Sequence, residues 1–219
     1  MSSEFVQSPM LDRFYQQFLK SENSADFVDR VTKHYCAGTL DKLSRFGPRT
    51  TRRAAVLALG FIGDYSQNEA LGSALMDSDR AVRLLADHGL RQIWFRQGSQ
   101  FEQQFAKKLA RSNNRNLHAE VVDLSDWMIT RSDSLAEIWN QRALALYALS
   151  DYELAIASCQ EALYLNRYHF LAAIGLANCY LQVDNVTAAL EAFRLSLRIN
   201  PDLESVRGQI LHLEKIAED

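Results

Sequence analysis

Apolar residues recur three and four positions apart along almost the whole chain, which is the spacing of one face of an α-helix. No stretch shows the strict alternation of apolar and polar residues that half-buried strands need. Short polar segments with turn-forming residues interrupt the pattern. The sequence therefore predicts an all-α protein with helices at residues 9–20, 25–36, 38–45, 49–62, 67–76, 79–96, 99–111, 117–130, 135–149, 152–165, 168–182, 186–199 and 202–217.

The loops between these helices are short, so consecutive helices are expected to pair as antiparallel hairpins. The sequence also repeats itself with two periods. At an offset of 34 residues, Ala143, Ala155 and Ala162 correspond to Ala177, Ala189 and Ser196; at an offset of 31, Arg52, Ala55, Leu59 and Ile62 correspond to Arg83, Ala86, Leu90 and Ile93. Because a single hairpin cannot bury its apolar face, repeated hairpins stack. We therefore expect an α-α superhelix, a right-handed solenoid of helix hairpins.

The 34-residue unit occurs twice, at residues 136–169 and 170–203. The first copy carries Trp139, Ala143, Tyr152, Ala155 and Ala162, and the second carries Leu176, Ala177, Tyr180, Ala189, Phe193, Ser196 and Pro201. This spacing resembles the tetratricopeptide repeat (TPR), in which small residues let the two helices cross closely. Helix 202–217 resembles the extra helix that caps such arrays. Three residues depart from the family pattern: Arg142 replaces an apolar residue, Ala173 a Trp, and Arg167 a Pro.

Residues 27–98 resemble HEAT-type repeats of the short bacterial kind, which also occur in phycobilin lyases. Their motif, Arg-x-x-Ala-x-x-x-Leu-x-x-Ile, begins at Arg52 and again at Arg83. The resemblance implies a ladder of ion pairs between repeats that involves Asp77 and Asp79, and Asp79 can also cap the helix that follows it. The expected organisation is then an N-terminal hairpin element (1–26), HEAT-like repeats (27–98), a degenerate linking hairpin (99–134), and two TPR-like repeats with a capping helix (135–219).

Composition is compatible with this interpretation. Hydrophobic residues make up 47% of the 219 residues and charged residues 23%, which is typical of folded proteins and excludes a mainly disordered chain. The three cysteines are widely spaced and no secretory signal precedes them, so we expect reduced thiols and a cytoplasmic protein. No apolar run is long enough to cross a bilayer, so no membrane association is expected.

Catalytic motifs are missing from the sequence. The five histidines occur in no metal-ligand spacing, and no nucleophile elbow, phosphate-binding loop or dinucleotide-binding loop is present. The segment from Gly60 to Gly63 is interpreted as close helix packing followed by a helix end at Gly63. The sequence thus predicts a protein that is not an enzyme and that binds neither a metal nor a cofactor.

The TPR resemblance implies a concave surface lined by the first helix of each repeat. In this chain the partner-binding candidates are Asn140, Leu144, Tyr147, Leu171, Ile174, Asn178 and Leu181. A common variant of the family clamps a C-terminal carboxylate, but Leu144 and Ile174 stand where that clamp needs Asn and Lys. The surface instead suits an amphipathic helix or an extended apolar peptide of another protein. The open alternative is that the capping helix or a second copy of the chain covers it.

Charge is distributed unevenly. Residues 1–115 hold 17 Lys and Arg against 12 Asp and Glu, a net charge of +5, and the remainder carries −8. The candidate basic patch consists of Arg45, Arg49, Arg91, Arg96, Lys107, Lys108 and Arg111. Such residues can bind a nucleic-acid backbone, although they are also consistent with ordinary solvated helix faces.

The sequence as a whole predicts a non-catalytic adaptor or scaffold that binds a peptide or helix of a partner protein. Nucleic-acid binding through the basic half is the alternative. Self-association is a further expectation, because the N-terminal hairpin presents Phe5, Phe14 and Phe18 as apolar candidates. Trp127 and Trp139 are expected to fill the seam between the two kinds of repeat.

Overall fold

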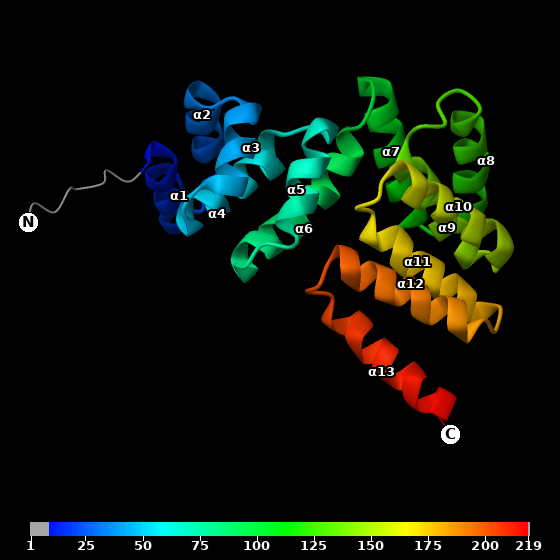
Figure 1. The fold of residues 1–219 in the computed structure, drawn as a ribbon. Helices are drawn as coiled ribbons and strands as arrows, with labels where there is room; N and C mark the ends of the chain where they lie inside the picture. The colour runs from blue at the N-terminus through cyan, green and yellow to red at the C-terminus, as the bar shows by residue number, and fades with distance from the viewer. Residues whose placement is uncertain (1–8, 219) are drawn as a thin grey trace, which may run out of the picture. The chain divides into compact units, whose positions relative to one another are not determined.

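The computed structural model describes the backbone of residues 9–218 and the side chains of residues 9–215. Within these residues it contains thirteen α-helices, two short 3-10 helices and no strand (Figure 1), which confirms the all-α class. The chain divides into two compact units between Ile93 and Trp94. We call them the N-terminal unit and the C-terminal unit.

The N-terminal unit is built around one buried helix. Its elements are α1 (Met10–Ser21), α2 (Ser24–His34), α3 (Ala37–Phe46), α4 (Arg49–Ile62), η1 (Tyr65–Gln67), α5 (Asn68–Ala74) and α6 (Arg80–Ile93). Every residue from Ala54 to Gly60 in α4 is buried, and the other five α-helices of the unit pack against α4. The continuous apolar run of α4 explains this position, because a helix that is hydrophobic on all sides is stable only in a core.

Helices α4 and α6 cross at two glycines. A β-carbon on Gly60 would lie 3.0 Å from the α-carbon of Gly89, and a β-carbon on Gly89 would lie 3.1 Å from the α-carbon of Gly60. The two backbones can therefore approach this closely only because neither residue has a side chain. Helix α4 ends as expected at Gly63, whose N–H donates to the carbonyl of Leu59 at 2.8 Å.

Aromatic side chains join the first helices of this unit. The ring of Phe18 lies 5.4 Å from that of Phe27 and 6.2 Å from that of Phe61. The ring of Phe14 lies 5.5 Å from that of His34, with the two planes inclined by 59°. Phe14 and Phe18 are thus half-buried within their own unit, while Phe5 lies outside the described residues. Self-association through this hairpin stays a prediction.

The C-terminal unit is a series of helix hairpins. Its elements are η2 (Trp94–Arg96), α7 (Gln100–Asn113), α8 (His118–Ile129), α9 (Ala136–Ala148), α10 (Tyr152–Leu165), α11 (Phe170–Gln182), α12 (Val186–Ile199) and α13 (Glu204–Glu218). From α7 to α13 each helix packs against the next, and α9 also contacts α7 and α11 (Figure 1). The core between α9, α10 and α11 includes the small residues Ala143, Cys159 and Ala177. Their small size allows the close helix crossings that the repeat pattern predicts.

Every predicted helix is present, and the ranges of α4, α10 and α12 match the prediction residue for residue. The largest difference is three residues, at the C-terminal end of the helix predicted at 79–96, and no other bound differs by more than two residues. The helix predicted at 79–96 is α-helical only to Ile93 and continues as the 3-10 turn η2, and the helix predicted at 67–76 ends at Ala74. Such tightening of a last turn is common where a helix end meets a loop.

Candidate functional site

Helix α9 carries the accessible half of the predicted partner surface. Leu144 is 48% exposed and Tyr147 is 36% exposed. The two residues are three positions apart, so their side chains are neighbours on one face of the helix. The ring of Tyr147 also meets that of Tyr152 at 5.6 Å, at the start of α10. Two large apolar side chains therefore lie together at the surface of α9.

Helix α11 contributes a more buried face. Leu171, Ile174, Asn178 and Leu181 are all half-buried. Ile174 and Leu181 pack against the apolar cluster that also contains Val206 and Ile210 of α13. The capping helix thus contributes to the core on which this face rests, and much of the apolar area of α11 serves the fold.

Asn140 is not part of an accessible surface. It was expected to face a partner, but the structure leaves it only 4% exposed, and its Nδ2 donates to Oε1 of Glu137 at 3.2 Å. Of the two amides predicted for the groove, only Asn178 remains partly exposed. Asn140 is buried because the carboxyl group of Glu137 is itself buried and needs hydrogen-bond donors, which the amides of Asn140 and Gln141 supply.

Glu137 is the centre of a buried polar cluster. Its Oε1 also accepts a hydrogen bond from Nε2 of Gln141 at 2.6 Å, and its Oε2 lies 3.2 Å from Nε2 of His169. Nδ1 of His169 accepts the N–H of Ala172 at 3.1 Å, which caps the start of α11. Because Nδ1 is an acceptor there, this network assigns the ring proton to Nε2, which donates to Glu137.

Trp94 covers this cluster. Its ring stacks on that of His169, with centroids 4.1 Å apart and planes inclined by 17°, and it is only 2% exposed. The sequence analysis did not single out Trp94 or His169. The sequence offered two signals: His169 stands at the position that caps α11, and Glu137 is an acidic residue in the first turn of α9. Neither signal indicates that these two residues contact each other or that Trp94 packs on them.

The contacts of Arg142 explain why an arginine can stand where the repeat pattern has an apolar residue. Its Nε donates to Oδ1 of Asp126 on α8 at 2.7 Å, and its Nη1 donates to the hydroxyl of Ser158 on α10 at 2.6 Å. The side chain is 14% exposed. A cation replaces an apolar residue because partners on both neighbouring helices satisfy it, so the hairpin of α7 and α8 is linked to the repeats.

The two tryptophans assigned to the seam differ in their exposure. Trp127 is 41% exposed and stacks with Phe105 at 5.7 Å, with the guanidinium of Arg131 4.0 Å from its ring centroid. Trp139 is half-buried and donates its indole N–H to the carbonyl of Asp133 at 2.9 Å. The expectation that Trp127 fills a buried seam is therefore wrong, because its ring faces solvent beside Arg131.

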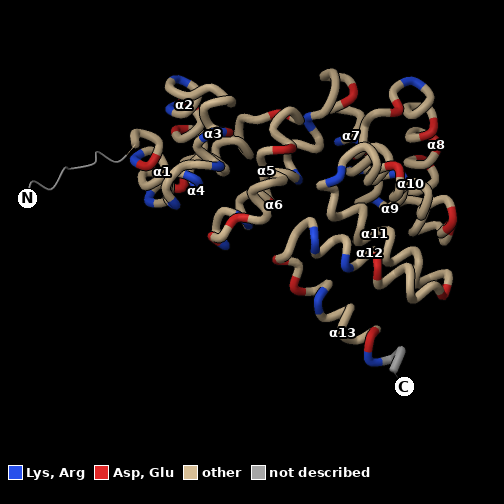
Figure 2. Tube along the Cα trace, in the orientation of Figure 1, with Lys and Arg blue, Asp and Glu red and all other residues tan. Residues whose placement is uncertain are grey.

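The candidate basic patch is divided between the two units. Arg45, Arg49 and Arg91 belong to the N-terminal unit, whereas Arg96, Lys107, Lys108 and Arg111 belong to the C-terminal unit. Nε of Arg45 lies 2.7 Å from Asp41 and Nε of Arg91 lies 2.8 Å from Asp87. Burial lowers the pKa of Arg96. Acidic residues are interspersed with the basic ones in both units (Figure 2), which weakens the attraction for a phosphate backbone.

The ion pairs implied for the middle of the chain do form. Arg52 binds Asp77 through two bonds of 2.7 and 2.8 Å, and Arg53 binds Asp79 through two bonds of 2.6 and 2.9 Å. Arg83 donates to the backbone carbonyl of Asp77 at 2.9 Å. Asp79 also accepts the N–H of Ala81 at the start of α6. These contacts fix the loop before α6 to α4, and the HEAT-type assignment stays a prediction.

The described residues offer no group of three or more His, Cys, Asp or Glu that could hold a metal ion. Over the same part of the chain, none of the helices has the length and apolar character needed to span a bilayer.

Comparisons with known proteins agree with the geometry of the C-terminal unit. Sequence models of the tetratricopeptide repeat match residues 136–169 and 172–203. A comparison with curated proteins finds no match to the chain. The similar solved structures include the first TPR of Spaghetti (RPAP3) bound to the HSP90 peptide SRMEEVD, at 15% identity and a TM-score of 0.50, covering 52% of this chain and 91% of that chain.

Another is the NMR structure of the first TPR domain of the human RPAP3 protein, also at 15% identity, with a TM-score of 0.48, covering 51% of this chain and 87% of that one. At this identity the first likeness shows the fold, and the sequence models locate the repeats within it. Residues 136–203 of this chain are two tetratricopeptide repeats.

Proposed function

We propose that the C-terminal unit is a protein-interaction module of an adaptor or scaffold and that it binds a segment of a partner protein over α9 and α11. The observation that carries the proposal is the pair of exposed side chains, Leu144 and Tyr147, on a first helix of the repeats. The solved TPR of RPAP3 with its bound peptide supports the use of this kind of fold for peptide binding.

The chemistry of the face indicates an apolar, uncharged segment. Helix α11 contains no charged residue. The two charged residues of α9 are Glu137 and Arg142, and both are engaged in internal hydrogen bonds. Leu144 and Ile174 cannot bind a carboxylate. We therefore expect an amphipathic helix or an extended apolar segment, with Asn178 as the partly exposed hydrogen-bonding group.

The test uses two variants with the same substitution at the same exposure. Leu144→Glu places a charge on the proposed face, whereas Leu154→Glu places it on α10, where Leu154 is 47% exposed. Both side chains are at the surface, so both variants should fold with an unchanged circular dichroism spectrum. A photo-crosslinking residue in place of Tyr147 then identifies the bound segment from a nuclease-treated native lysate.

A synthetic copy of that segment is titrated against the three proteins. We expect Leu144→Glu to weaken binding by roughly tenfold or more, as for a charge placed in an apolar contact, and Leu154→Glu to leave it unchanged. Equal affinities of the two variants would rule out this face as the binding site. If crosslinked partners were recovered from an untreated lysate but not from the nuclease-treated one, the result would instead favour a nucleic-acid ligand bound by the basic residues.

A further inference from the structure

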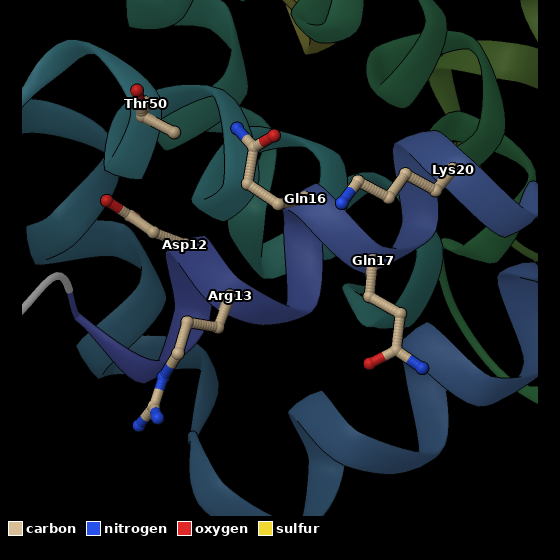
Figure 3. Close-up of a pocket in the computed structure, with 6 residues that line it drawn as sticks. All are labelled: Asp12, Arg13, Gln16, Gln17, Lys20 and Thr50. Atoms are coloured by element: carbon tan, nitrogen blue, oxygen red, sulfur yellow. The ribbon is translucent and has the colours of Figure 1, made fainter.

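A cavity of about 420 Å³ lies along α1 in the N-terminal unit. It is lined by Asp12, Arg13, Gln16, Gln17 and Lys20 of α1 and by Thr50 of α4 (Figure 3). Pockets that hold small ligands usually fall in the range of roughly 300–1,000 Å³. All six lining side chains are polar, so the cavity is suited to a hydrophilic group.

Asp12 is the unusual member of this lining. Asp12 is buried, with only 7% of the residue exposed. Its Oδ1 is shielded from solvent and has no hydrogen-bond donor among the described residues. A buried carboxylate oxygen without a donor costs free energy, because it loses its hydration and gains nothing in return. A ligand that supplies N–H donors would remove that cost once the carboxyl group rotates and turns this oxygen toward the cavity.

The cations of the same unit do not supply these donors. Figure 3 shows Asp12 and Gln16 extending from α1 on the side where Thr50 lies, whereas Arg13 extends to the opposite side. The side chain of Lys20 extends back along α1 toward Gln16, but it supplies no hydrogen bond to Oδ1 of Asp12. On α4, Arg52 and Arg53 are bound to Asp77 and Asp79. Asp12 consequently forms no ion pair within the part of the chain that the structure describes.

We propose that this cavity binds a guanidinium group, with Asp12 as its counter-ion. A guanidinium carries five N–H donors in one plane and can offer two of them to a carboxylate. The amide oxygen of Gln16 and the hydroxyl of Thr50 accept others, which an ammonium group could not reach with the same geometry. The group comes from an arginine side chain of a partner or from a free guanidinium compound. The site lies in the other unit from the TPR face, so it does not depend on the proposed function.

The test is a titration of the full chain, observed by backbone NMR, with three probes. Nα-acetylarginine amide represents an arginine within a protein, agmatine represents a free guanidinium compound, and Nα-acetylcitrulline amide is the uncharged isostere. We expect saturable shifts of α1 resonances with a guanidinium probe and none with the citrulline probe. Binding of the acetylarginine amide identifies a protein side chain as the source, and binding of agmatine alone identifies a free compound.

Two variants connect the binding to Asp12. Asp12→Asn should raise the dissociation constant by about tenfold or more, as expected for the loss of a charge-assisted hydrogen bond. Glu22→Gln makes the same charge change at the exposed end of α1 and should leave it unchanged. If Asp12→Asn does not fold, Thr50→Val, which removes one acceptor, should weaken binding several-fold. Equal shifts with the citrulline probe, no saturable shift with either guanidinium probe, or unchanged affinity of a folded Asp12→Asn or Thr50→Val would overturn the proposal.

Discussion

The carboxyl group of Glu137 and the imidazole of His169, 32 residues apart in the sequence, meet at 3.2 Å in the interior of the C-terminal unit. Glu137 lies in the first turn of α9 and His169 caps α11, so the bond joins the beginnings of the two first helices of the repeats. Because both groups are almost fully buried, the contact has to be hydrogen-bonded on both sides to be stable.

The first prediction concerns this cluster. Glu137→Ala removes the acceptor of three donors, on Asn140, Gln141 and His169. Since each buried donor without a partner costs roughly 1–3 kcal/mol, we expect the free energy of unfolding of the C-terminal unit to fall by about 3 kcal/mol. Urea denaturation followed by circular dichroism and tryptophan fluorescence measures the change. Glu153→Ala, an exposed acid on α10, is the control and should change it by less than about 0.5 kcal/mol. A similar effect of both variants would show that the buried cluster contributes no specific stability.

The second prediction concerns the crossing of α4 and α6. Gly60→Ala places a methyl group 3.0 Å from the backbone of Gly89, and backbone atoms cannot move aside without shifting a helix. We expect the gain in helix propensity to be outweighed, with a net loss of roughly 1–2 kcal/mol in the N-terminal unit. Gly38→Ala, where a β-carbon would meet no atom within 4 Å, should instead stabilise the unit by roughly 0.5 kcal/mol. Thermal denaturation of both variants checks the opposite signs. Stabilisation by Gly60→Ala would mean that the crossing is looser than described.

The third prediction concerns pH. The hydrogen bonds from Arg53 hold the pKa of Asp79 below its ordinary value of 3.8. Burial acts against ionisation of Asp77, but the bonds from Arg52 and from the backbone of Asp79 outweigh it and lower the pKa of Asp77 as well. A pKa that is lowered in the folded state means that the ionised form stabilises the fold. This stabilisation is complete above pH 3.8 and is lost as the pH falls through the lowered pKa.

The urea midpoint of the N-terminal unit should therefore drop steeply below about pH 4. In Asp79→Asn the midpoint should be lower at neutral pH and should change less between neutral and acidic pH. Asp29→Asn breaks the exposed pair with Lys33 and should keep the wild-type slope, because solvent screens such a pair. An identical slope in Asp79→Asn would exclude the ion pair as the cause.

The fourth prediction concerns the thiols. Cys36 is exposed, and its bond with the Thr39 hydroxyl lowers the pKa of its thiol, which increases the reactive thiolate. The hydrogen bond with Cys179 and burial raise the pKa of Cys159, and both residues are 1% exposed. Ellman's reagent should therefore label one thiol per native chain rapidly and three after denaturation. Cys36→Ser should show no rapid phase, and a rapid phase in that variant would mean that the core around Cys159 opens readily.

The local pattern of residues in the sequence was sufficient to predict the helices and to locate the two TPR repeats. The bounds of α4, α10 and α12 follow from the spacing of apolar residues and from the turn residues on either side. The spacing of small residues in 136–203 indicated the TPR, because only small residues allow helices to cross closely. An ion-pair ladder that involves Asp77 and Asp79 was expected only from the resemblance to HEAT-type repeats, and the structure identified Arg52 and Arg53 as the partners.

Only the tertiary structure decided which of these residues face solvent. Asn140 and Asn178 are both amides on first helices, yet Asn140 is buried and donates to Glu137, a residue that also meets the distant His169. Asp12 resembles any acidic residue in a first helical turn until α4 is placed against α1. Helical periodicity defines the faces of each helix by itself. Burial of a face depends on neighbours that are far away in the sequence, and their contacts form only when the chain folds.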